Sequence, residues 1–183
     1  MTISVQKHRL VQARWVPSPN YNERPSPRVD MLVVHNISLP PNEFSGPYVE
    51  AFFCNQLDCR VHPYFDEIKD LKVSAHLFIK RSGDIIQFVG FDQRAWHAGL
   101  SEWQGETNCN DFSIGIELEG ADHIPYDAAQ YEALAKVTKA LQKAYPSITD
   151  DRIVGHSDIA PGRKTDPGDS FDWAHYRQLL ERL

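Results

Sequence analysis

Short apolar runs that end at polar or turn-forming residues are the first regular feature of this chain. Residues 31–36 (MLVVHN) are rich in β-branched side chains, which predicts a buried strand that ends at His35. Residues 152–156 (RIVGH) predict a second short strand, which ends at His156. In residues 76–90, two apolar runs flank a Ser-Gly-Asp sequence, which predicts a β-hairpin. The pattern therefore places a histidine at the end of two separate strands.

Residues 112–120 (FSIGIELEG) alternate between apolar and polar positions, as a strand with one buried face does. One face carries aliphatic side chains, those of Ile114, Ile116 and Leu118. The other face carries small or acidic residues, which are Ser113, Gly115, Glu117 and Glu119. Two carboxylates therefore point to the same side of the predicted strand.

Helical spacing is clearest in residues 127–145. Asp127 and Gln130 form a start that resembles a capping box, and Pro146 stops the helix. Large apolar or aromatic side chains repeat along one stripe, formed by Tyr131, Leu134, Val137, Leu141 and Tyr145. We assign this stripe to the core of the protein and give it no role in cofactor binding.

The order of the predicted elements indicates an α/β fold. It runs strand, helix, hairpin, strand, helix, strand, helix, with shorter helices expected within residues 48–56 and 173–183. This order favours a single mixed central β-sheet flanked by helices. The length suits one domain over residues 1–183. Residues 1–29, with four prolines in residues 16–27, are expected to form an irregular segment packed on that domain.

Composition narrows the classes of partner. The chain is 42% hydrophobic and 24% charged, which is ordinary for a globular domain. The formal net charge is −6 and no cluster of Lys and Arg occurs, so we expect neither nucleic acid nor a membrane surface as a partner.

The cysteines and the first residues predict a compartment. Cys54, Cys59 and Cys109 lack the spacing of a disulfide framework, so we expect reduced thiols. The N-terminal stretch lacks the apolar core of a secretory signal, and no apolar run reaches membrane-spanning length. We therefore expect a cytoplasmic protein.

A candidate metal site comes from three separate segments. His35 and His156 each precede a loop rich in Pro and Gly, and Asp166 lies ten residues after His156. Functional groups of α/β proteins gather at strand ends, where loops open a crevice. Two imidazoles and one carboxylate, with a fourth position open, are typical of a catalytic zinc site. The expected cofactor is one Zn2+ per chain.

Each of these residues also has a simpler explanation. A histidine at a strand end is usually hydrogen-bonded in the core, and an aspartate before Pro-Gly is usually a turn residue. Lys164 lies two residues before Asp166, and this further ionisable group favours the functional interpretation of the loop.

Five stretches carry a resemblance to a known family. They are VVHNISLPP, SAHLFI, AWHAG, CNDFSIGIELEG and GHSDIAPGRKTDPG, within residues 16–173. Together they resemble the N-acetylmuramoyl-L-alanine amidase type 2 family, whose superfamily includes bacteriophage T7 lysozyme and the peptidoglycan recognition proteins. The resemblance is strongest to its cytoplasmic 1,6-anhydro-N-acetylmuramyl-L-alanine amidases. It implies an amidase-like fold and a zinc enzyme of peptidoglycan recycling. Its substrate is then an anhydromuramyl-peptide, cut between the lactyl group and L-alanine.

The resemblance also implies roles for individual residues. The histidines of VVHN and GHSD match zinc ligands, here His35 and His156, and the aspartate of KTDPG matches the third, here Asp166. The lysine of KTDPG matches a catalytic residue, here Lys164. Spacing does not choose between the two carboxylates of GIELEG, but the family match selects the first, Glu117, as the catalytic acid.

Weaker candidates are expected to contact the substrate. Asn36 follows a ligand, Trp96 offers a ring on which a sugar can stack, and Lys72 supplies a positive charge for the anionic end of the stem peptide. His97 is either a substrate contact or a hydrogen-bonded structural residue, and for His76 we favour the structural role.

Other functions stay open at this point. A broader amidase would also cut intact peptidoglycan, and a non-catalytic module would hold muropeptides without cutting them. A structural protein with a solvated charged loop would bind no metal. Asn108 stands where relatives often carry a second basic residue, so that charge is missing here. We expect a monomer.

Overall fold

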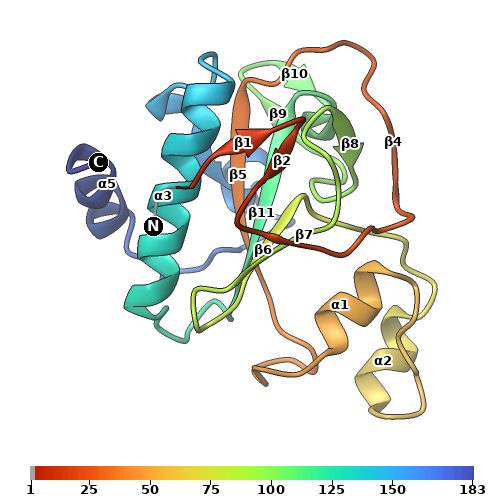
Figure 1. The fold of residues 1–183 in the computed structure, drawn as a ribbon. Helices are drawn as coiled ribbons and strands as arrows, with labels where there is room; N and C mark the ends of the chain where they lie inside the picture. The colour runs from red at the N-terminus through yellow and green to blue at the C-terminus, as the bar shows by residue number, and fades with distance from the viewer. Residues whose placement is uncertain (1–2) are drawn as a thin grey trace.

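A mixed β-sheet forms the centre of the molecule in the computed structural model, which describes residues 3–183 (Figure 1). Within these residues the sheet has six strands in the order β12, β5, β11, β6, β7, β3. In that order they span Ile153–Gly155, Met31–Ile37, Ser113–Glu119, Leu77–Ile79, Ile85–Gln87 and Arg14–Trp15. The first four are parallel, whereas β7 is antiparallel to β6 and parallel to β3. The carboxyl ends of β12, β5 and β11 therefore meet at one edge.

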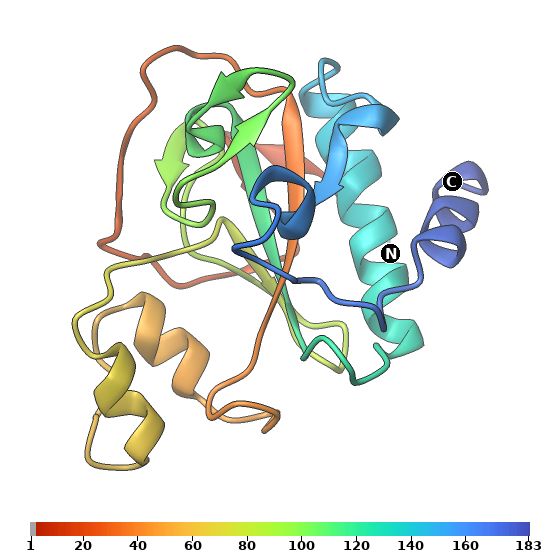
Figure 2. The same ribbon diagram turned by 180° about the vertical axis from the view of Figure 1, so that it is seen from behind.

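Helices surround this sheet unequally (Figures 1 and 2). The helical segments are α1 (Tyr48–Phe53), α2 (Pro63–Ile68), α3 (Ala128–Ala144), α4 (His156–Ile159), α5 (Trp173–Glu181), η1 (Cys109–Asp111) and η2 (Asp150–Arg152), the last two being 3-10 turns. α3 and α5 lie side by side, and α1 and α2 form a separate pair away from α5. Along residues 3–183, each helix is too short or too polar to cross a lipid bilayer.

The two long central strands divide their side chains between two faces. On one face, the aliphatic side chains of Leu32, Val34, Ile114 and Ile116 share a core with Leu134 and Leu141 of α3. On the other face, His35 and Glu117 are direct neighbours in the parallel register of β5 and β11. The predicted division of side chains between the two faces of residues 112–120 is confirmed, but both faces of β11 are buried, and the face with the polar residues borders the candidate site.

Most of the predicted elements are present with shifted ends. The hairpin is confirmed as β6 and β7, and the two predicted C-terminal helices are α3 and α5. The predicted end at His35 was wrong, because β5 continues to Ile37 in its pairing with β11. His156 does not end a strand either. It is the first residue of α4, because the chain turns into a helix directly after Gly155.

In the described part of residues 1–29, irregular stretches alternate with short strands that the expectation of an irregular segment did not include. Residues 1–2 lie outside the described residues, and the remainder holds four short strands. These four are β1 (Val5–Gln6), β2 (Arg9–Leu10), β3 and β4 (Tyr21–Glu23), and the remaining strands outside the central sheet are β8 (Gln93–Ala95), β9 (Glu102–Trp103) and β10 (Glu106–Thr107). They form through backbone pairing, as when β3 joins β7 in the central sheet, and pairs this short leave no hydrophobic period to read.

His76 has a structural role within the sheet. Its Nδ1 accepts a hydrogen bond from the N–H of Gly115 (3.1 Å), so its Nε2–H donates to the carbonyl of Gln93 (3.0 Å). The guanidinium of Arg24 lies 3.1 Å from the same Nε2. Burial, and then the charge of Arg24, lower the pKa of His76 to about 3.

We expect His76 to make the folded protein sensitive to acid. Its pKa in the fold lies below the ordinary value of 6.5, so the unfolded chain binds the proton first. The contribution of His76 to the free energy of unfolding is then fully present above about pH 6.5. It decreases by about 2 kcal/mol as the pH falls to about 5. Urea titrations of wild type and His76→Asn across this range test the expectation, and the variant should show the shallower pH dependence. Equal slopes would show that His76 does not contribute.

Candidate metal centre

Three side-chain atoms converge at the carboxyl edge of the sheet. His35 Nδ1, His156 Nδ1 and Asp166 Oδ2 lie 3.0 Å from one another in each pairing. In the described part of the chain, these residues form the one group of three or more His, Cys, Asp or Glu side chains able to hold a metal ion. Both histidines are buried, and Asp166 is partly buried.

The fold explains how residues so distant in sequence meet. β12 and β5 are parallel neighbours, so His156, directly after β12, comes beside His35 near the end of β5. The loop after α4 then folds back, and the N–H of Ser157 donates to the carbonyl of Asp166 (3.0 Å). This hydrogen bond brings the carboxylate to the two imidazoles.

Partners on the far side of each ring determine which nitrogen is protonated. His156 Nε2 lies 3.0 Å from the carbonyl oxygen of Ala98, which can only accept, so Nε2 carries the proton and Nδ1 presents a lone pair. His35 Nε2 lies 2.9 Å from His97 Nδ1, and His97 Nε2 lies 3.2 Å from the Ser113 hydroxyl. Donation from His35 to His97 and on to Ser113 leaves His35 Nδ1 free as well.

This donor set fits a divalent metal ion. Two lone pairs and a carboxylate oxygen that approach to 3.0 Å repel one another unless a proton or cation lies among them. Zinc takes imidazole nitrogen and carboxylate oxygen at about 2.0–2.2 Å, which puts tetrahedral ligand atoms about 3.3 Å apart. The observed separations are close to that value.

The protonation states also suit a metal. Burial lowers the pKa of His35 to about 4, so its ring is neutral near pH 7. Burial alone would raise the pKa of Asp166, but interactions with the adjacent imidazoles of His156 and His35 outweigh it and hold the pKa below its usual range. A neutral imidazole and an ionised carboxylate are the forms that bind metal.

Glu117 supplies a carboxylate beside this centre. It is a strand neighbour of His35, and it lines the same cleft. Within residues 3–183, its buried Oε2 has no hydrogen-bond partner. Burial, and then the charge of Asp166, raise the pKa of Glu117 well above its ordinary value, while Lys164 acts in the opposite direction.

Glu119 differs from Glu117 although both are on the same face of β11. Its Oε1 accepts from the N–H of Ser45 (2.5 Å) and its Oε2 from the N–H of Arg81 (2.9 Å). Glu119 therefore joins two loops to the sheet, and Glu117 is the carboxylate with a free oxygen.

A cleft of about 650 Å³ opens over the centre. Residues around the centre and residues of the α1–α2 pair line this cleft. The first group includes Asn36, Trp96, His97, Glu117, Lys164 and Asp166, and the second includes Phe52, Tyr64 and Ile68. The exposed Lys164 therefore shares one cavity with the three converging atoms. A cavity of this size and mixed lining suits a small organic ligand.

The weaker candidates occupy different positions. Both amide protons of Asn36 are engaged, with Asp122 Oδ1 (2.8 Å) and the carbonyl of Pro167 (3.1 Å). The indole N–H of Trp96 donates to Asn22 Oδ1 (2.7 Å). Lys72 lines a separate cavity of about 40 Å³ beside the α1–α2 pair.

A family model for N-acetylmuramoyl-L-alanine amidase matches residues 25–169. The chain belongs to this family. The 1,6-anhydro-N-acetylmuramyl-L-alanine amidase AmpD of Escherichia coli (strain K12) is 57% identical over 174 residues, 94% of this chain and 94% of the relative. The crystal structure of a Se-Met AmpD derivative matches with a TM-score of 0.94 at 55% identity, over 96% of this chain and 98% of that one. The structure of AmpDh3 from Pseudomonas aeruginosa in complex with anhydromuramic pentapeptide matches with a TM-score of 0.59 at 30% identity, over 85% of this chain and 61% of that one.

Sequence reasoning missed residues that brace the centre of this amidase. Asp122 accepts from Asn36 through Oδ1 and from the hydroxyl of Thr165 through Oδ2 (2.5 Å), which ties the loop before Asp166 to β5. Asn110 and Arg163 hold the segment that contacts both histidines. All three bracing side chains lie in loops or short turns, where spacing gives no signal.

Proposed function

We propose that this chain is a zinc-dependent amidase that hydrolyses the amide bond between the lactyl group of 1,6-anhydro-N-acetylmuramic acid and L-alanine of the stem peptide. One Zn2+ would be held by His35, His156 and Asp166. The observation that carries the proposal is the convergence of their three donor atoms beside the unpaired Oε2 of Glu117. The similarity to AmpD enzymes supports the choice of substrate.

Glu117 is the proposed general base and acid. When bound, zinc would polarise the amide carbonyl and acidify water near neutral pH. Glu117 would accept the proton of that water and pass it to the departing amine of L-alanine. Its raised pKa makes the carboxylate a stronger base than an ordinary glutamate.

Lys164 is the proposed oxyanion group. It lies on the loop between His156 and Asp166 and lines the cleft. As the carbonyl becomes tetrahedral its oxygen gains negative charge, which an ammonium group stabilises. A donor aimed at such an oxygen is worth about 3–4 kcal/mol of the barrier.

Substrate contacts complete the proposal. Trp96 lines the cleft and is assigned to a sugar ring, and Asn36 is assigned to the muramyl-peptide through its carbonyl oxygen, since its amide protons are engaged. Lys72 is assigned to the outer, anionic end of a longer peptide. We further propose that residues 1–183 form one domain, and that the protein acts as a cytoplasmic monomer on fragments released by wall turnover.

The set of residues argues against a module that only binds muropeptides, because His35, His156, Asp166, Glu117 and Lys164 all border one cleft.

Whether intact wall is also cut is a matter of substrate preference. The test is to incubate the purified chain separately with anhydromuramyl-tripeptide and with purified sacculi, and to follow released peptide by mass spectrometry. We expect free tripeptide from the first and far less peptide from the second. Equal release from both would favour the broader amidase, and binding without release would favour the module.

A further inference from the structure

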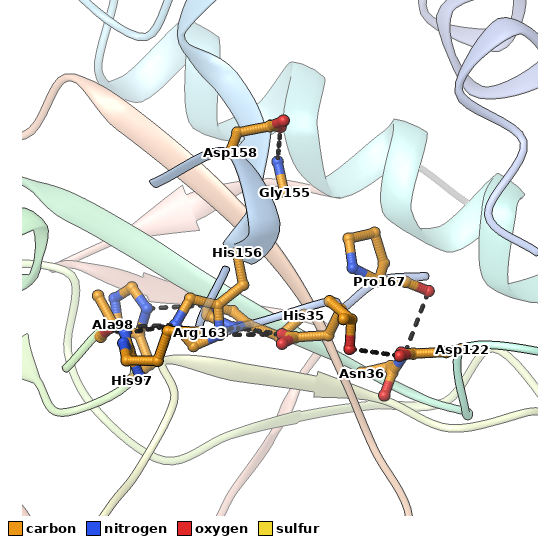
Figure 3. A network of polar contacts seen from close by, with 12 residues as sticks. His35, Asn36, His97, Ala98, Asp122, Gly155, His156, Asp158, Arg163 and Pro167 are labelled. Carbon is orange, nitrogen blue, oxygen red and sulfur yellow. Dashed lines mark hydrogen bonds and ion pairs between the residues drawn. The ribbon is translucent and has the colours of Figure 1, made fainter. Parts of the chain in front are cut away.

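His97 and Ala98 are consecutive residues, and each contacts a different imidazole of the metal centre (Figure 3). His97 Nδ1 lies 2.9 Å from His35 Nε2, and the carbonyl oxygen of Ala98 lies 3.0 Å from His156 Nε2. Both contacts are to the ring nitrogen that is not directed at Asp166. One dipeptide thus reaches both histidines.

Asn110 fixes this dipeptide from the opposite side. Asn110 is 6% exposed, and its Oδ1 accepts from the N–H groups of both His97 (3.0 Å) and Ala98 (2.8 Å). A single buried acceptor therefore holds two adjacent peptide units. Asn110 lies in η1, just before β11, so it connects the dipeptide to the central sheet.

The ring of His97 sits in a space that β11 leaves for it. A Cβ atom on Gly115 would lie 2.4 Å from Cγ of His97, so any larger residue there would displace the ring. The hydroxyl of Ser113, on the same face of the strand, lies 3.2 Å from His97 Nε2. The ring is therefore confined by shape and by hydrogen bonds at both nitrogens.

Arg163 secures the other half of the dipeptide. Its Nη2 donates to the carbonyl oxygens of Ala98 (2.7 Å) and Leu100 (2.6 Å). Arg163 belongs to the loop that carries Asp166. The carbonyl that orients His156 is thereby tied to the segment that supplies the carboxylate.

We propose that His97 and Asn110 are positioning residues that fix the tautomer and ring orientation of both histidines of the metal centre. The inference rests on the proposed metal site and extends it to residues that would not touch the metal. His97 accepts the Nε2–H of His35, and Asn110 holds Ala98 so that its carbonyl accepts the Nε2–H of His156. Loss of such partners typically costs 10–100-fold in metal affinity.

The decisive variants of His97 differ in one acceptor atom. His97→Leu removes the acceptor, whereas His97→Asn can place Oδ1 where Nδ1 was. Zinc affinity is measured by competition with a chromophoric chelator, and the visible spectrum of the cobalt-loaded protein reports ligand geometry. We expect about a 10–100-fold loss of affinity and an altered cobalt spectrum for His97→Leu, with most of the affinity recovered in His97→Asn. His175→Asn, an exposed histidine on α5, is the matched control.

Substitutions at Gly115 and Asn110 test the position of the same ring and dipeptide independently. Gly115→Ala keeps His97 but displaces its ring, and should weaken zinc binding to a similar extent. Asn110→Asp keeps an acceptor for both N–H groups and should bind zinc better than Asn110→Leu. Thermal unfolding of the metal-free variants identifies any that fail to fold.

The outcomes separate this inference from the proposed function. If wild type binds zinc and folded His97→Leu, Gly115→Ala and Asn110→Leu bind it equally well, the positioning role is wrong and the metal site stands. If wild type binds no zinc, both are wrong. A graded loss in the acceptor-deficient variants, with recovery in His97→Asn and Asn110→Asp, supports the inference.

Discussion

Replacing Asp166 with alanine is expected to remove metal binding and amidase activity together. The substitution takes away the negative charge of the donor set and leaves only the two imidazoles, whose Nδ1 atoms lie 3.0 Å apart. Loss of a partner outside the ligand shell already costs about 10–100-fold in affinity, so loss of a direct ligand should cost more. Zinc retained after gel filtration and the rate of peptide release are measured on the same sample. His156→Ala should give the same result.

A carboxylate on the same loop provides the control. Asp169 is exposed and lies three residues after Asp166, and Asp169→Ala should retain both metal and activity. Full activity of folded Asp166→Ala or His156→Ala would contradict the ligand assignment. Loss of metal with normal turnover would contradict a catalytic metal.

A large loss of turnover is also expected when Glu117 is replaced. Glu117→Gln keeps the size of the side chain but cannot accept the proton from water, so turnover should fall by about two to four orders of magnitude. Zinc content should stay near that of wild type, because the nearest ligand, His35, is a neighbour on β5 and keeps its own contacts. Metal analysis and peptide release distinguish this result from loss of a ligand.

Glu119→Gln is the matched control on the same face of β11. Glu119 accepts from two backbone N–H groups, so its substitution should lower the free energy of unfolding by about 1–3 kcal/mol and leave turnover of the folded enzyme nearly unchanged. A reversed pattern, with turnover lost in Glu119→Gln and retained in Glu117→Gln, would exchange the two roles. Normal turnover in both would require another base.

The sequence was most informative where periodicity was long. The alternation along residues 112–120 and the stripe of α3 predicted which side chains share a face, because each pattern extends over several residues or helical turns. The N-terminal strands are two or three residues long, so they carry no such signal. The α2 helix has only six residues and begins at Pro63, and we did not predict it.

The centre was predictable from residue types together with the family resemblance. Short apolar runs marked His35 and His156, although neither residue ends its strand. The approach of Asp166 depends on how its loop folds back, which spacing alone does not give. The role of Asn110 was hidden for another reason. Its function is carried by two backbone N–H groups of a distant loop, and a sequence pattern does not record contacts to the backbone.

The central claim is that His35, His156 and Asp166 hold a zinc ion on which cleavage of anhydromuramyl-peptides depends. The most direct measurement counts zinc per purified chain and follows tripeptide release from anhydromuramyl-tripeptide before chelation, after it and after zinc is restored. We predict one zinc per chain, with release lost on chelation and regained with zinc. Release that continues in the fully metal-free protein would contradict the claim, as would a zinc-loaded protein that releases no tripeptide.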